Sequence, residues 1–337
     1  MPEQKFDEIL KDLKNKIYYP VYLFSGVESF FIDELTNFMD ENILTASEKE
    51  FNQTVVYGLD TNVYDLISMA KRFPMMSNYQ VIIVREAQHL KESEKLVEYI
   101  ANPLKSTILL IAYKHKSMDK RTKLYKSIKE KGIVFDAQKL WENQVSTWIE
   151  KRIQSMGFTI GARESELLAQ YLGADLGKID NELKKMALNI RQGSKITDID
   201  IEENVGISKD YNVFELTDAL KDRNVLKANR IINYFAANPK ENSIFMVLPV
   251  LYNFFFRAMV LSQLKKHDNR EIASKLNIKP SQISKYQQVL SKYRVMKLAS
   301  IIEEIKSYDL KAKGLGNVNA SQGELLRELI YKILHDD

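Results

Sequence analysis

The sequence predicts an α/β domain followed by a longer, entirely helical region. Over the first 140 residues, short β-branched apolar runs alternate with helical patterns, which is typical of a parallel sheet covered by helices. From Trp141 onward the strand pattern stops and helical periodicity continues. A chain of 337 residues is long enough for about two or three domains. We predict three, with bounds 1–140, 141–208 and 209–337.

The predicted strands of the first domain read as continuous apolar runs, as expected when both faces of a sheet are covered. They are Val21–Phe24, Asn52–Tyr57, Gln80–Arg85, Thr107–Ala112 and Gly132–Asp136, with helices expected at Ser29–Leu44, Val63–Lys71, Ser93–Ala101 and Asp119–Lys131. In the helical region, stop signals at Asn238-Pro239 and Pro280-Ser281 and a polar, glycine-containing break from Lys311 to Gln322 separate the helices.

The composition excludes several classes of function. The chain has no cysteine, which excludes disulfides, thiolate metal sites and cysteine nucleophiles and points to a reducing compartment. The four histidines are scattered, and none has a second ligand at metal-binding spacing, so we expect no metal and no cofactor. The N-terminal segment is charged and helical in pattern, without the apolar core of a signal peptide. We therefore expect a cytoplasmic protein.

The segment from Ile244 to Leu264 is long enough to span a membrane, but it carries Pro249, Asn253 and Arg257. A charge in the middle of a span is costly. We therefore interpret the segment as a helix buried in a multi-helix domain or at a subunit interface, and we expect no membrane partner.

The stretch from Tyr22 to Phe31 has the layout of a phosphate-binding loop, because a short strand runs through Ser25-Gly26 directly into a helix. Such a loop would read GxxxxGK[ST], with a lysine on the phosphates and a hydroxyl on magnesium. Here Gly26 is followed by a carboxylate, Glu28, and neither a second glycine nor a lysine is present. The corner has the shape of a nucleotide site without its chemistry.

A second part of a nucleotide site is also missing. In a phosphate-hydrolysing α/β domain, a later strand ends in an acidic pair that holds magnesium and activates water. The corresponding strand here ends in Arg85-Glu86, so an arginine stands where the metal-holding aspartate belongs. We expect neither nucleotide binding nor a catalytic residue in this chain.

Two further stretches are candidates for binding. Phe73, Met75 and Met76 lie in a short connection beside Pro74, where large apolar side chains either anchor a partner or cap the sheet. The stretch from Asn269 to Leu290 has the pattern of a helix-turn-helix, in which Gln282 and Lys285 would face DNA bases. Its apolar positions are also those that any packed helical hairpin needs.

The net positive charge of the chain is concentrated in its last third. Residues 209–337 carry 21 basic and 14 acidic side chains, whereas residues 1–140 carry 20 of each. This excess suits either proximity to nucleic acid or a solvated lysine-rich surface.

Taken in order, these features resemble the family of delta subunits of the bacterial DNA polymerase III clamp loader. The resemblance runs through PVYLFSGVESFFIDE at 20–34, RFPMMSNYQVIIVRE at 72–86, MDKRTKLYKSIKEKG at 118–132, LGADLGKIDNELKKMAL at 172–188, NVFELTDAL at 212–220 and EEIKSYDLKAKG at 303–314. It covers nearly the whole chain, and the order and spacing of these segments are more specific than any one of them.

The resemblance implies an AAA+-like α/β domain with a degenerate nucleotide site at Gly26, Glu28 and Arg85, a helical lid and a C-terminal helical collar. Such subunits have no catalytic activity of their own and are accessory to a DNA polymerase holoenzyme. They bind the beta sliding clamp and hold one interface of the ring open. The collar joins them to the ATP-using subunits and to delta prime, and the assembly loads the clamp on primed DNA.

Residue by residue, the resemblance places clamp binding on Met75 and Met76, at the end of a helix before the third strand, with Phe73 as a supporting position. Many relatives have leucine-phenylalanine at this pair. Lys311 and Lys313, in the predicted break, are candidates for contact with the DNA backbone. The rival interpretations are an active AAA+ ATPase and a helix-turn-helix DNA-binding regulator.

Overall fold

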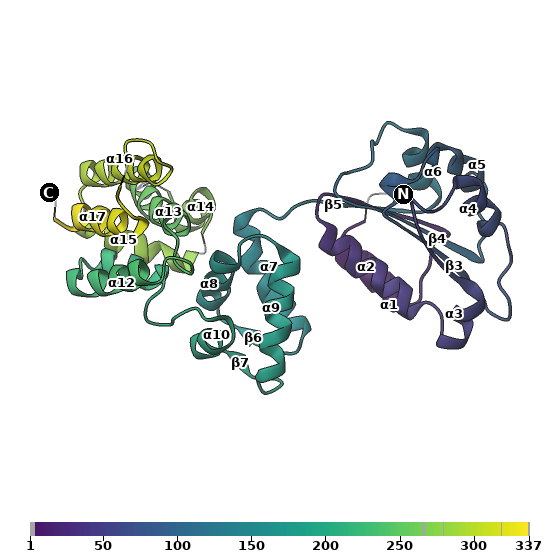
Figure 1. Ribbon diagram of the computed structural model, residues 1–337, viewed down its shortest axis with the longest axis horizontal. Helices are drawn as coiled ribbons and strands as arrows, with labels where there is room; N and C mark the ends of the chain where they lie inside the picture. Colours follow the sequence, from purple (N-terminus) through teal and green to yellow (C-terminus); the bar gives the residue numbers. More distant parts are fainter. Residues whose placement is uncertain (1–3, 265–266, 279, 318, 336–337) are drawn as a thin grey trace. The chain divides into compact units, whose positions relative to one another are not determined.

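The computed structural model describes residues 4–264, 267–278, 280–317 and 319–335 (Figure 1). Its contacts divide the chain into two compact units, Met1–Leu140 and Trp141–Asp337. A further division of the second unit at residue 208 stays a prediction.

The first unit is a parallel five-stranded sheet in the order β2-β3-β4-β1-β5. Its strands are β1 (Val21–Gly26), β2 (Gln53–Tyr57), β3 (Gln80–Arg85), β4 (Thr107–Tyr113) and β5 (Ile133–Ala137). Strand β1, the fourth in this order, pairs with β4 on one side and with the edge strand β5 on the other. Its carboxyl end at Gly26 lies at the carboxyl edge of the sheet, where parallel α/β sheets bind their ligands.

Helices cover both faces of this sheet (Figure 1). Strand residues such as Phe24 and Ile83 pack on α1 (Phe6–Lys14) and α2 (Ser29–Asn42). Their sequence neighbours, such as Leu23 and Ile82, face the opposite layer. That layer is formed by α4 (Val63–Ala70), α5 (Val97–Ile100) and α6 (Lys123–Lys131). The alternation along buried strands explains why the sequence showed continuous apolar runs.

The predicted fold class is confirmed, and the strands lie within two residues of their predicted bounds. The expected helix Ser93–Ala101 begins as a 3-10 turn, Ser93–Leu96, and continues as α5. The expected helix Asp119–Lys131 begins only at Lys123, because the Thr122 side chain caps it by accepting from the Tyr125 N–H. A helix that the sequence analysis missed, α3 (Ala46–Asn52), precedes β2.

The second unit is helical apart from one short ladder. Its helices are α7 (Glu142–Ser155), α8 (Ala162–Leu172), α9 (Leu176–Asn189), α10 (Asp198–Val205), α11 (Val213–Lys221), α12 (Val225–Ala237), α13 (Ile244–Gln263), α14 (Asn269–Leu276), α15 (Ile283–Lys292), α16 (Val295–Ala312) and α17 (Gln322–His335). The expectation that no strand follows Trp141 is wrong, because β6 (Thr159–Ile160) and β7 (Lys195–Ile196) form a parallel pair. Strands of two residues are too short to show a period.

One core joins the helices α11 to α17. Helix α13 contacts α11, α14, α15, α16 and α17 and contributes Leu251, Phe254 and Phe255 to this core. By length and composition alone α13 could cross a membrane. Its place among the other helices agrees with the interpretation as a buried core helix.

Candidate functional site

The loop between α4 and β3, residues 71–79, carries large apolar side chains on its surface. The exposed fraction is 75% for Phe73, 63% for Met75 and 102% for Met76. Helix α4 ends at Ala70, so the methionine pair lies within this loop and not at the end of a helix as expected. Because these side chains face solvent, they are available to a hydrophobic pocket on another protein.

Met76 has a backbone conformation that is unusual for its residue type. Its φ angle is +53°, in the left-handed region. This region costs a residue other than glycine about 1–2 kcal/mol. Such a conformation persists only where the surrounding structure enforces it, and it is common at binding sites.

Side chains from α3 hold this loop in place. The Asn52 side chain, only 3% exposed, accepts a hydrogen bond from Met75 N at 2.6 Å and donates one to Met75 O at 2.9 Å. Beyond Met76, the Ser77 hydroxyl donates to Glu48 Oε1 at 2.8 Å. Hydrogen bonds from Thr45 and Ser77 lower the pKa of Glu48, so this acceptor remains ionised at neutral pH.

The start and end of the loop are also anchored. The Thr107 hydroxyl donates to Ala70 O at 3.0 Å, and the Gln80 amide donates to Met69 O at 2.9 Å. The last turn of α4 is thus bound to the first residues of β3 and β4. An exposed apolar loop with a fixed backbone favours binding, because it loses little conformational entropy on association.

In the connection between β1 and α2, packing explains why position 26 is a glycine. A Cβ atom at Gly26 would lie 2.2 Å from Ala137 O, and its φ angle of +144° suits glycine alone. The Glu28 N–H then donates to the same Ala137 O at 3.0 Å. The glycine therefore lets β1 turn against the end of β5, and a phosphate is not needed to account for it.

The N-terminus of α2 is capped by the chain's own anion. The Glu28 carboxylate accepts from the Phe30 N–H at 3.3 Å and occupies the N-cap position of α2. In phosphate-binding loops, the free N–H groups of this first helical turn hold the phosphate. Here a carboxylate satisfies one of them and would repel a phosphate from the rest.

Basic and acidic side chains pair with one another at the carboxyl edge of the sheet. The Arg85 guanidinium donates to Asp40 Oδ2 at 3.0 Å and to Asn37 Oδ1 at 2.9 Å on α2. The Lys114 ammonium lies 2.6 Å from Asp33 Oδ1 and 3.3 Å from Glu86 Oε1. Arg85, which we predicted to stand where a metal-binding acid would lie, is thus itself bound by side chains of α2.

Glu86 remains ionised within this cluster. Burial alone would raise the pKa of Glu86, but hydrogen bonds from Gln88 and Lys114 lower it below its ordinary value. Within the described ranges, no group of three or more acidic or histidine side chains is placed to hold a metal ion.

The residues that a helix-turn-helix reader would present to DNA bases contact their own chain. The Gln282 amide donates to the Glu166 carboxylate at 3.0 Å. The Lys285 ammonium donates to the Thr217 hydroxyl at 3.2 Å and lies 3.3 Å from the Asp218 carboxylate. These contacts support the interpretation of this stretch as a packed helical hairpin.

The two lysines proposed for DNA contact lie at the end of α16. Lys311 is in the last turn of the helix, with its ammonium 4.3 Å from the centre of the Tyr308 ring. Lys313 follows the helix, and its ammonium lies 2.6 Å from Asp309 Oδ2. The expectation that the polar break begins at Lys311 is therefore wrong, because α16 continues to Ala312.

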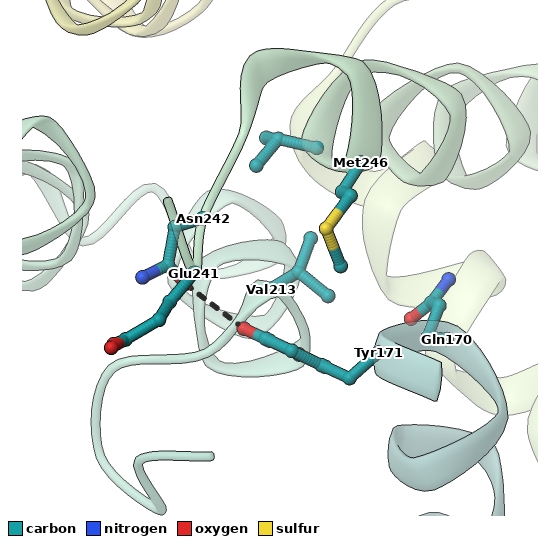
Figure 2. A pocket seen from close by; sticks show the side chains of 7 residues that line it. Gln170, Tyr171, Val213, Glu241, Asn242 and Met246 are labelled. Atoms are coloured by element: carbon teal, nitrogen blue, oxygen red, sulfur yellow. Dashed lines mark hydrogen bonds between the residues drawn. The ribbon is translucent and has the colours of Figure 1, made fainter. Parts of the chain in front are cut away.

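A small pocket in the second unit lies between α8 and the segment that leads into α13. Figure 2 shows the Tyr171 hydroxyl pointing at Asn242, and it donates to Asn242 Oδ1 at 3.1 Å. Burial raises the pKa of Tyr171 to about 12. The cavity measures ≈ 10 Å³, about the space of one water molecule. It is a packing defect around a structural hydrogen bond.

Asn52 and Glu48 are functional candidates that the sequence analysis missed. The signal that identifies their helix was present, because Thr45-Ala-Ser-Glu48 has the spacing of a capping box. The structure contains this box, with the Thr45 N–H donating to Glu48 Oε2 at 2.9 Å.

Comparison with known proteins gives consistent results over most of the chain. Residues 22–138 match the family model described as DNA polymerase III, delta subunit, and residues 210–326 match the model of its C-terminal domain. DNA polymerase III subunit delta of Bacillus subtilis is 24% identical over 320 residues, which cover 91% of either chain. A probable DNA polymerase III subunit delta of Aquifex aeolicus is 20% identical and covers 73% of this chain and 71% of its own.

A solved structure shows the same fold. The Bacillus subtilis DNA clamp loader delta protein aligns with a TM-score of 0.53 and 22% identity, covering 98% of this chain and 99% of its own.

Proposed function

The chain belongs to the family of DNA polymerase III delta subunits, and we propose that it binds the beta sliding clamp through the loop 71–79 and opens one interface of the ring. It is a component of the clamp loader of DNA polymerase III. We propose the clamp as the direct partner and ring opening as the mechanism.

The observation that carries the proposal is the exposed and ordered apolar loop. Phe73, Met75 and Met76 face solvent, while the loop is held by the hydrogen bonds of Asn52 with the Met75 backbone and by the bond that Glu48 accepts from the Ser77 hydroxyl. Methionine is unbranched and polarisable, so the pair can adapt to an apolar pocket on the clamp. Met-Met differs from the leucine-phenylalanine of many relatives, and this affects the affinity more than the position of the site.

The energy of this contact is of the size that ring opening needs. Burying two methionine side chains contributes about 3–6 kcal/mol before the costs of association. Shifting a ring from 1% open to 99% open requires about 5.5 kcal/mol of preference for the open state. The loop can therefore act as a wedge, which holds the ring open, only if most of its apolar surface is buried against the open interface. Phe73 adds to that buried surface.

We further propose that the chain neither binds nor hydrolyses ATP. The α2 N-terminus is capped by Glu28, Gly26 is needed for packing, and Arg85 is bound by Asp40 and Asn37. These contacts use the groups that would otherwise meet phosphate and magnesium. Energy for clamp loading would then come from ATP-using partner subunits.

Residues 209–337 are proposed as the collar that joins the other subunits, delta prime among them. Helix α13 exposes Phe245, Tyr252 and Phe256 on one side, and the rings of Tyr252 and Phe256 stack 5.5 Å apart. Lys311 and Lys313 are proposed to approach the backbone of primed DNA within the assembly. The whole complex would act in the cytoplasm.

The test is a titration of the full-length chain against its cognate beta clamp. A Met75→Ala, Met76→Ala double variant should lose at least about 100-fold in affinity, since about 3 kcal/mol of apolar burial is removed. The matched control is Met296→Ala, which truncates a methionine that is 81% exposed on α16. Equal affinity of the double variant and the parent would refute the wedge, and no binding by the parent would refute the proposed function.

A further inference from the structure

We propose that Asn52 is a positioning residue, whose buried amide sets the backbone of the clamp-binding loop before the clamp arrives. This inference rests on the proposed function of the loop. Asn52 is the last residue of α3 and does not belong to the loop, yet both of its strongest hydrogen bonds go to the backbone of Met75.

The geometry of these bonds is that of a neighbouring strand. The carbonyl oxygen of the Asn52 amide accepts from Met75 N at 2.6 Å, and its nitrogen donates to Met75 O at 2.9 Å. One side chain thus satisfies the donor and the acceptor of one residue, as a strand partner does in an antiparallel ladder. The same nitrogen donates to Glu48 O at 3.1 Å, which fixes the amide to its own helix.

A second contact from α3 secures the other side of Met76. Glu48 Oε1 accepts from the Ser77 hydroxyl at 2.8 Å, while Glu48 Oε2 accepts from the Thr45 N–H and hydroxyl. The residues before and after Met76 are therefore both bound to one short helix. Between these two points Met76 takes its positive φ angle and exposes its whole side chain.

This arrangement explains how a loop with strongly exposed side chains keeps a defined backbone. Phe73, Met75 and Met76 have little of their surface packed against the protein, so their side chains contribute little to ordering the loop. The hydrogen bonds from α3 supply that order in the free chain. A loop that is already in its binding conformation loses less entropy on association, so it binds more tightly.

Two Asn52 variants test this role. Asn52→Ala removes both bonds to Met75 and should weaken clamp binding about tenfold, the effect expected from freeing one residue's backbone. Asn52→Asp has nearly the same shape but places a carboxylate oxygen against Met75 O, and it should also weaken binding about tenfold or more. If Asn52 only fills space, the aspartate variant will bind like the parent.

Hydrogen exchange separates positioning from general loss of stability. In the free Asn52→Ala chain, exchange at the Met75 amide, whose N–H donates to the Asn52 side chain, should be about tenfold faster or more, while amides in β3 and β4 keep their protection. The control is Ile128→Val, a core change on α6 that lowers stability in a buried cluster containing no residue of the loop 71–79. It should leave both loop exchange and clamp affinity unchanged.

The outcomes distinguish this inference from the proposed function. The inference is overturned if the parent binds the clamp, the Met75→Ala, Met76→Ala variant does not, and both Asn52 variants bind like the parent. If the parent itself does not bind the clamp, the proposed function fails and the inference fails with it.

Discussion

Replacing Met76 with glycine should change the stability of the free chain and its clamp affinity in opposite directions. Met76 is held at a φ angle of +53°, and relieving this strain is worth about 1–2 kcal/mol. Glycine gives back about 0.5–1 kcal/mol through the entropy of the unfolded chain. Met76→Gly should therefore raise the free energy of unfolding by up to about 1.5 kcal/mol.

The same substitution should weaken clamp binding. Met76 is fully exposed in the free chain, so its burial on the clamp contributes about 1.5–3 kcal/mol, which corresponds to about 10–150-fold in affinity. Met76→Ala is the matched variant, because it removes the side chain beyond Cβ but keeps the strain. It should lose nearly as much affinity without gaining stability.

Two measurements decide this prediction: denaturant unfolding of the free chain and titration against the clamp. The reasoning is refuted if Met76→Gly unfolds more easily than Met76→Ala, because the left-handed conformation would then carry no strain. It is refuted equally if either variant binds the clamp like the parent, because Met76 would then lie outside the interface.

Three further predictions concern the rest of the chain. Equilibrium dialysis of the chain with Mg-ATP should show no saturable binding at millimolar nucleotide, because Glu28 and Arg85 use the groups that phosphate and magnesium need; a micromolar Kd would contradict this. Gly26→Ala should cost more than about 3 kcal/mol by denaturant unfolding, because its Cβ would meet Ala137 O, and a cost near 1 kcal/mol would contradict the packing argument. Burial alone would raise the pKa of Asp180, but hydrogen bonds from its basic partners lower it, so its contribution to stability is present above pH 4 and lost as pH falls through the lowered pKa. Asp180→Asn should make the melting temperature less sensitive to pH below about 4, and an unchanged acid dependence would contradict this.

The sequence was sufficient for the sheet because β1, β3, β4 and β5 are almost entirely buried and carry a strong apolar signal. It was insufficient for α3, which is short and polar, although the capping box at Thr45 and Glu48 marked its start. The ladder of β6 and β7 could not be predicted, since two residues show no period. Helix α16 continues through Lys311 because Tyr308 and Asp309 contact the lysines that follow them, and such contacts are not visible in composition.

The candidate site was found only in part for a similar reason. Large apolar residues beside Pro74 predicted either an exposed anchor or a cap on the sheet, because a short connection cannot bury all of them. The residues that position the anchor lie more than 20 positions earlier in the chain, and the pairing of Asn52 with Met75 depends on where α3 ends. The loss of a nucleotide site after β1 was predicted from the residues that are missing there. The contacts made by Gly26, Glu28 and Arg85 in that region are visible only in the structure.

The most direct test of the account is to measure opening of the clamp ring by this chain alone, in the absence of nucleotide. A fluorescent pair placed across the clamp's subunit interface reports the separation of the two sides. We predict that the parent chain increases this separation without ATP, and that the Met75→Ala, Met76→Ala variant does not, even at concentrations that saturate any residual binding. If the parent binds the clamp but leaves the interface closed, or if the double variant opens it as well as the parent does, the loop 71–79 is not the wedge.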